Sequence, residues 1–158
     1  MIIVIAVVVF LVLGGGFFYF VWNSVSETDT VLQPYEAFGK AEEFYGMQQY
    51  DSAGYYYKYA TDHDRYMIEA WLGRGNTHYM QNTYDSALWY YETASAIDQT
   101  SFQPRYNIAW WYYTQKQYQS SLDKLNVLQQ DFIENTEVLQ LLGDNYYEMN
   151  DFEPALQW

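Results

Sequence analysis

The residues that could support catalysis or metal binding are two histidines, His63 and His78, and the chain's 20 acidic residues. Asp62, His63 and Asp64 are three potential metal ligands in a row, but consecutive side chains point in different directions. We therefore interpret this segment as a solvated turn. No spacing selects a catalytic pair among the carboxylates. The sequence also lacks a phosphate-binding glycine loop, a nucleophile elbow and an HExxH helix. We predict no enzyme, no cofactor and no metal site.

The charge of the chain excludes some classes of partner. Twenty acidic residues against 7 basic ones give a formal net charge of −13, and all of these charges lie beyond Trp22. Such a surface repels phosphate backbones, so we predict no nucleic-acid partner. The absence of cysteine removes disulfides and thiol catalysis. An aromatic content of 22% favours an ordered domain over a disordered chain.

Residue types recur along the chain in steps of 34, as the Tyr50, Asp51, Ser52 and Ala53 run shows when it returns at 84–87. A second column, placed earlier in the unit, contains only tyrosine: Tyr45, Tyr79, Tyr113 and Tyr147. A constant step of this length is the mark of a repeat protein.

In period and content the chain resembles the tetratricopeptide repeat (TPR) family from about Pro34 onward. The matches in the unit 68–101 are Trp71, Gly75, Tyr84, Ala87, Tyr91 and Ala94. The resemblance implies an all-α solenoid in which every unit is two antiparallel helices and neighbouring units supply the core. We divide the array into 34–67, 68–101, 102–135 and 136–158, the last being incomplete. Trp158 falls within a helix, so we expect truncation of a longer protein, or a cap from a partner or a second copy.

The first 22 residues carry no charge, which favours a single transmembrane helix at 1–22 followed by a polar linker at 23–33. The alternatives are a cleaved signal peptide, with Ser24 and Ser26 near the cleavage site, and a buried core helix. Acidic residues follow the span, so we expect the repeat domain on the extracytoplasmic side of a membrane. Gly14–Gly16 are open to two interpretations, a close helix contact or a flexible point.

In the TPR family the first helices of the units line a concave groove for peptides or proteins. Carried over by position, the groove residues here are Phe38, Glu42, Tyr45, Leu72, Asn76, Tyr79, Tyr106, Trp110, Tyr113, Gln140, Asp144 and Tyr147. Alternatively, the four tyrosines of the column pack between neighbouring helices and do not bind a ligand. The resemblance also makes His78 a packing residue.

Chaperone-binding members of the TPR family bind the C-terminal carboxylate of a peptide with Lys and Asn side chains of the groove. In this chain only Asn76 matches one of those positions. An apolar segment with a basic flank therefore fits this groove better than a peptide carboxylate does. Additional aromatics on the second helices are interface or packing residues: Tyr55, Tyr56, Trp89 and Tyr90.

These observations predict a membrane-anchored scaffold that binds other proteins. We expect a structural or assembly subunit of a cell-envelope complex of the secretion, pilus or motility type. A periplasmic chaperone or translocon accessory protein is one alternative. A homo-oligomer, in which the incomplete fourth unit docks on a second copy, is the other.

Overall fold

The computed structural model describes residues 6–13, 16–23 and 31–151, with side chains in the last range only. The chain divides into two compact units, Met1–Leu32 and Gln33–Trp158. Parts of the predicted anchor, most of the predicted linker and the last seven residues of the fourth predicted unit lie outside the described residues.

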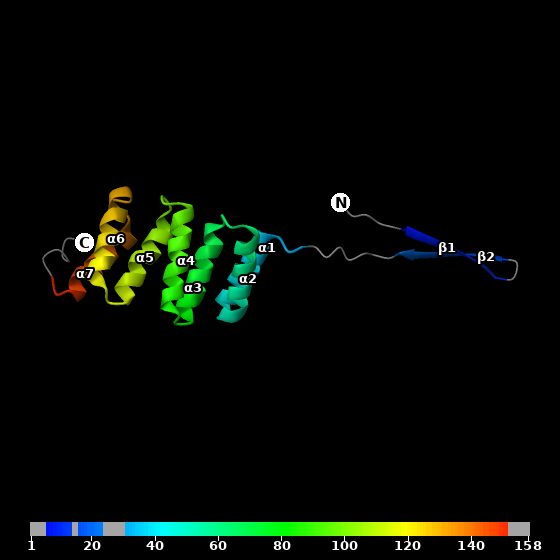
Figure 1. Ribbon diagram of the computed structural model, residues 1–158, viewed down its shortest axis with the longest axis horizontal. Helices are drawn as coiled ribbons and strands as arrows, with labels where there is room; N and C mark the ends of the chain where they lie inside the picture. The colour runs from blue at the N-terminus through cyan, green and yellow to red at the C-terminus, as the bar shows by residue number, and fades with distance from the viewer. Residues whose placement is uncertain (1–5, 14–15, 24–30, 152–158) are drawn as a thin grey trace. The chain divides into compact units, whose positions relative to one another are not determined.

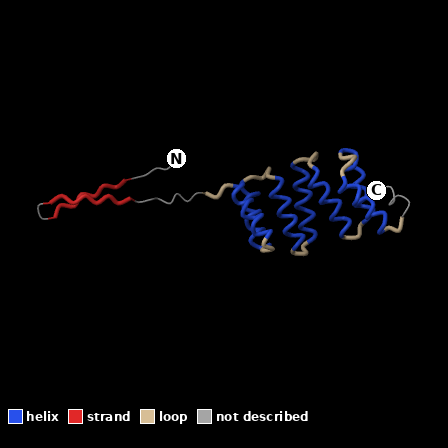
Figure 2. The backbone as a smooth tube through the Cα atoms, turned by 180° about the vertical axis from the view of Figure 1, so that it is seen from behind, coloured by secondary structure: helices blue, strands red, loops and turns tan. Residues whose placement is uncertain are grey.

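The second unit is an all-α helical repeat array, which confirms the predicted solenoid (Figure 1). Each helix packs on the next one in the chain, and first helices of neighbouring units also touch, α1 with α3 and α5 with α7. Figure 2 shows the same array from behind. The helices in residues 31–151 are α1 Pro34–Gly46, α2 Tyr50–His63, α3 Ile68–Met80, α4 Tyr84–Ile97, α5 Phe102–Thr114, α6 Tyr118–Asp131 and α7 Thr136–Glu148.

The turn after each first helix has the same conformation in all four units. One residue takes a positive φ of 58–60°, at Gln48, Asn82, Lys116 and Asn150, again 34 positions apart. In the first turn the amide of Gln48 donates to the carbonyl of Tyr45, and that of Gln49 donates to Phe44. This hydrogen-bond pair is a Schellman motif, which satisfies the last helical carbonyls and reverses the chain. Asn is a usual residue at such a position, but Gln and Lys are not, so the sequence offers little sign of the motif in the first and third units.

Two glycines of α3 receive tyrosine rings from the helices on either side. A Cβ on Gly75 would lie 2.4 Å from the Tyr91 ring of α4, and one on Gly73 would lie 2.3 Å from the Tyr57 ring of α2. The absence of a side chain therefore lets α3 approach both neighbours closely. Gly75, one of the residues that match the TPR family, is a close-approach residue beside Tyr91. Gly73 does the same between units, which the sequence did not indicate.

The core changes character along the array. In the first two units small residues such as Ala53 and Ala87 are fully buried beside Tyr57 and Tyr91. In the third unit leucines take over, with Leu125 and Leu128 both 0% exposed. These leucines form one hydrophobic cluster with Val138, Leu141 and Leu142 of α7.

In residues 6–13 and 16–23 the structure contradicts the predicted transmembrane helix. Residues Ala6–Leu13 (β1) and Gly16–Asn23 (β2) form an antiparallel pair, with a register from Ala6 opposite Asn23 to Leu13 opposite Gly16. Their β-branched and aromatic residues favour strands, and glycine is a poor helix former. Within the described residues, the helices are too short or too polar to cross a bilayer.

Candidate functional site

We call the twelve residues predicted to line a groove the tyrosine face. All of them lie on the first helices of the units, α1, α3, α5 and α7, and none is buried. The exposed ones are Glu42, Gln140, Asp144 and Tyr147, and the other eight are half-buried. The side chains are therefore accessible to a partner while much of their surface is already packed.

Two members of the tyrosine face are held by tyrosines of the second helices. The Tyr91 hydroxyl donates to Oδ1 of Asn76 at 2.8 Å, and the Tyr57 hydroxyl donates to Oε1 of Glu42. The two bonds occupy equivalent places in adjacent units, 34 residues apart. Burial and the bond to Glu42 raise the pKa of Tyr57, and burial raises that of Tyr91. The tyrosines thus remain protonated donors, and Glu42 and Asn76 are kept in fixed orientations.

Ring contacts hold the tyrosine column in place. Within its unit, Tyr79 meets Tyr84 edge-on at 5.2 Å between ring centroids, and Tyr45 meets Tyr50 in the same way at 5.5 Å. Between units, Tyr79 lies 4.7 Å from the Trp110 ring. Tyr45 and Tyr79 are therefore both packing and surface residues, since each makes a ring contact and is only half-buried. Rings fixed in this way lose little further freedom when a partner binds.

The fourth unit places carboxylates beside the tyrosines of the third. Burial raises the pKa of Tyr106, with Glu137 and Asp144 adding to the shift. Burial, Asp144 and Glu148 together raise that of Tyr113. These carboxylates of α7 therefore lie near enough to the α5 tyrosines to disfavour ionisation of their hydroxyls.

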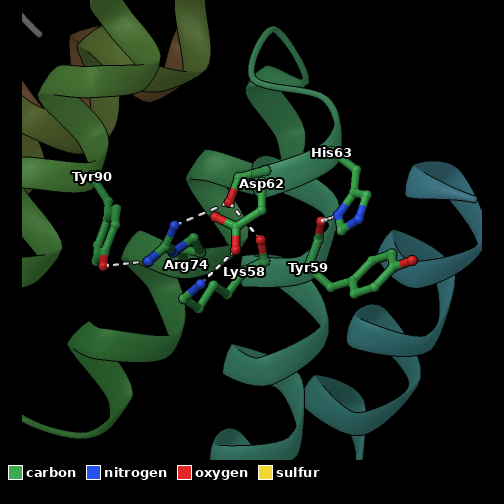
Figure 3. A network of polar contacts seen from close by, with 7 residues as sticks. Lys58, Tyr59, Asp62, His63, Arg74 and Tyr90 are labelled. Atoms are coloured by element: carbon green, nitrogen blue, oxygen red, sulfur yellow. Dashed lines mark hydrogen bonds and ion pairs between the residues drawn. The ribbon is translucent and has the colours of Figure 1, made fainter. Parts of the chain in front are cut away.

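A second cluster surrounds Arg74 of α3, away from the tyrosine face. Its Nη2 donates to the Tyr90 hydroxyl at 2.7 Å (Figure 3). Its Nη1 donates to Thr61 Oγ1 at 3.0 Å. The guanidinium also lies over two aromatic rings, 4.3 Å from that of Tyr90 and 5.2 Å from that of Trp71. Arg74 therefore links α2, α3 and α4, a contact set that sequence spacing did not reveal.

The Asp62–Asp64 segment does not converge on one point. Asp62 pairs with Lys58 at 2.5 Å, while the His63 ring stacks on Tyr59 and its Nδ1 lies 2.9 Å from the Tyr59 carbonyl (Figure 3). The described part of the chain contains no group of three acidic, histidine or cysteine residues placed to hold a metal ion.

His78 stacks on Tyr90 with 4.9 Å between centroids, and its Nδ1 lies 2.8 Å from Thr83 Oγ1. It is half-buried in packing, as the sequence indicated.

A hollow of about 410 Å³ lies where α4, α5 and α6 meet. Its lining includes Glu92, Arg105 and Lys124, and Arg105 is already engaged with Asp131 at 2.7 Å. The mixed charges show no preference for one kind of ligand.

Comparison with known proteins reveals fold similarity at low sequence identity. No protein-family model and no curated protein sequence matches the chain. Among solved structures, it superposes on a chain of the APC/C hetero-tetramer Cut9-Hcn1 with a TM-score of 0.75 and 16% identity, covering 82% of this chain and 25% of that one. MamA gives a TM-score of 0.72 at 12% identity, over 81% of this chain and 75% of MamA.

A third match is the first TPR of Spaghetti (RPAP3), bound to the HSP90 peptide SRMEEVD. It has a TM-score of 0.62 and 13% identity, over 79% of this chain and 91% of that one. These similarities show a TPR-like fold. The chain spans about a quarter of the length of the Cut9-Hcn1 chain that it matches.

Proposed function

We propose that this chain is a scaffold that binds another protein through its tyrosine face, and that it has no enzymatic role. The observation that supports the proposal is the row of half-buried rings fixed along one set of helices, Tyr45, Tyr79, Trp110 and Tyr113. Aromatic residues dominate protein interfaces because they bury a large area at a small entropic cost.

The test is affinity purification of the tagged full chain, with and without the double substitution Tyr79→Ala and Tyr113→Ala. We expect a partner that co-purifies with the unmodified chain and is lost from the variant. The matched control is Tyr55→Ala with Tyr66→Ala, which removes two rings that are each 65% exposed and lie off the tyrosine face. Circular dichroism of each variant checks that the helices remain folded.

The other outcomes argue against the proposal in different ways. A partner that survives the Tyr79 and Tyr113 changes but is lost from the control variant would bind at α2 and the turn that follows it. Recovery of the protein alone, as an oligomer of defined size, indicates self-association instead. Weak and variable partners favour an accessory chaperone over a structural subunit.

We further propose that the complex is part of a cell envelope, with the repeat domain on the extracytoplasmic side. One support is the uncharged, apolar sequence of residues 1–22, which favours a lipid surface over water. The other is the acidic sequence that follows, which is repelled by the anionic lipids of a cytoplasmic leaflet. Membrane fractionation of the full chain and of a chain lacking residues 1–22 tests this. We expect the full chain in the membrane fraction and the shortened one in the soluble fraction. Equal partitioning of the two contradicts the proposal.

A further inference from the structure

The charge of the tyrosine face has one sign. Glu42 and Asp144 belong to it, and Glu137 and Glu148 interact with the hydroxyls of Tyr106 and Tyr113 at its edge. The Tyr118 hydroxyl donates to Oε2 of Glu148 at 3.3 Å. Both the first and the fourth unit therefore place carboxylates among or beside the aromatic residues of the tyrosine face.

None of the 7 Lys and Arg residues belongs to the tyrosine face. Five of them contact residues elsewhere: Lys40 over Tyr56, Lys58 with Asp62, Arg65 with Tyr66, Arg74 with Tyr90 and Arg105 with Asp131. Lys116 occupies the turn after α5, and Lys124 lies exposed on α6. The carboxylates of the tyrosine face thus have no counter-ion among its own residues.

A surface with aromatic rings beside carboxylates is suited to bind basic side chains. Lysine and arginine attract carboxylates by charge, and they also bind the faces of aromatic rings. The chain itself contains such a contact between a cation and aromatic rings, where the Arg74 guanidinium lies over Trp71 and Tyr90. An acidic segment, such as the peptide ending EEVD, would instead meet like charge.

We infer that the partner binds the tyrosine face through a segment rich in lysine or arginine with apolar residues between them. The inference rests on the proposed function, since it specifies the ligand of the same surface. A second copy of this chain is a poor occupant, because it has a net charge of −13 and most of its cations are already engaged.

The first experiment is selection of binders to the full chain from a displayed library of random 12-residue peptides. We expect selected peptides to have a net charge of about +3 or more and to lose binding to the Tyr79→Ala, Tyr113→Ala variant. Neutral or acidic peptides that depend on Tyr79 and Tyr113 contradict the charge inference but leave the scaffold function intact. Selected peptides that do not depend on those rings contradict both.

A second experiment separates the tyrosine face from the overall negative charge. Asp144→Asn with Glu148→Gln removes one charge from the tyrosine face and one from its edge. Glu92→Gln with Asp123→Asn removes two exposed charges from the second helices α4 and α6. For a selected peptide we expect the first pair to weaken binding by about three- to thirtyfold and the second pair by less than twofold. Equal weakening by both pairs overturns the inference.

Discussion

The residue at the positive-φ position of each turn has a conformational cost that depends on its side chain. Asn82 and Asn150 tolerate the left-handed region because a short polar side chain bonds locally, whereas Gln48 and Lys116 do so less well. We predict that Gln48→Asn raises the free energy of unfolding by about 0.5–1 kcal/mol, measured in urea at constant ionic strength. Gln48→Val should lower it, because a β-branched residue is strained there. The opposite order of the two variants would contradict the turn geometry.

His78 makes stability dependent on pH. Burial, with the nearby positive charge of Arg74 as a second cause, lowers the pKa of His78 below 6.5. The folded state therefore binds a proton less readily than the unfolded state, and stability decreases as the pH falls through and below the unfolded value.

We predict that the urea midpoint falls less between pH 7.5 and 5.5 in the His78→Gln variant than in the unmodified protein. His63→Gln is the matched control, because it removes the other histidine. An equal fall in the unmodified protein and the His78 variant would show that other groups cause the pH dependence.

At the scale of the helix, the two tyrosine rings seated on α3 make its glycines intolerant of substitution. A methyl group at Gly75 must displace the buried Tyr91 ring, whereas nothing lies within 4 Å of a Cβ on Gly39. We predict that Gly75→Ala lowers the free energy of unfolding by about 1–3 kcal/mol through overpacking. Gly39→Ala, the matched control in α1, should raise it by about 0.5–1 kcal/mol through helix propensity. Both are measured by urea unfolding, and a stable Gly75→Ala would refute the close contact.

At the scale of the whole array, stability depends on the contacts between units. Trp111 of α5 is 6% exposed, and its Nε1 donates to the Tyr84 carbonyl of α4 at 2.8 Å. We predict that Trp111→Phe costs about 1–2 kcal/mol and lowers the m-value, because the second and third units then unfold less cooperatively. Trp89→Phe, at a position 56% exposed, is the control and should cost less than half as much. An unchanged Trp111→Phe protein would show that this contact does not couple the units.

The helical repeat was predictable because it depends on the order of residue types along the chain. Apolar and small residues at helical spacing, returning every 34 positions, leave few other packings for the unit. Residues 6–13 and 16–23 were wrongly predicted to be helical, because an apolar run rich in valine and aromatics suits a strand as well as a helix. The composition of the tyrosine face also came from the sequence, and its role in binding stays a prediction.

The sequence by itself determined the repeat, the helical class of the array and the excess of negative charge, since each is a property of residue order or count. Only the tertiary structure decided which side chains meet across units. Tyr57 reaches Gly73, and Arg74 joins Thr61 to Tyr90, because the rotation and spacing of adjacent helices are set by their packing. The same packing brings Arg74 to the Tyr90 hydroxyl and Arg105 to the carboxylate of Asp131.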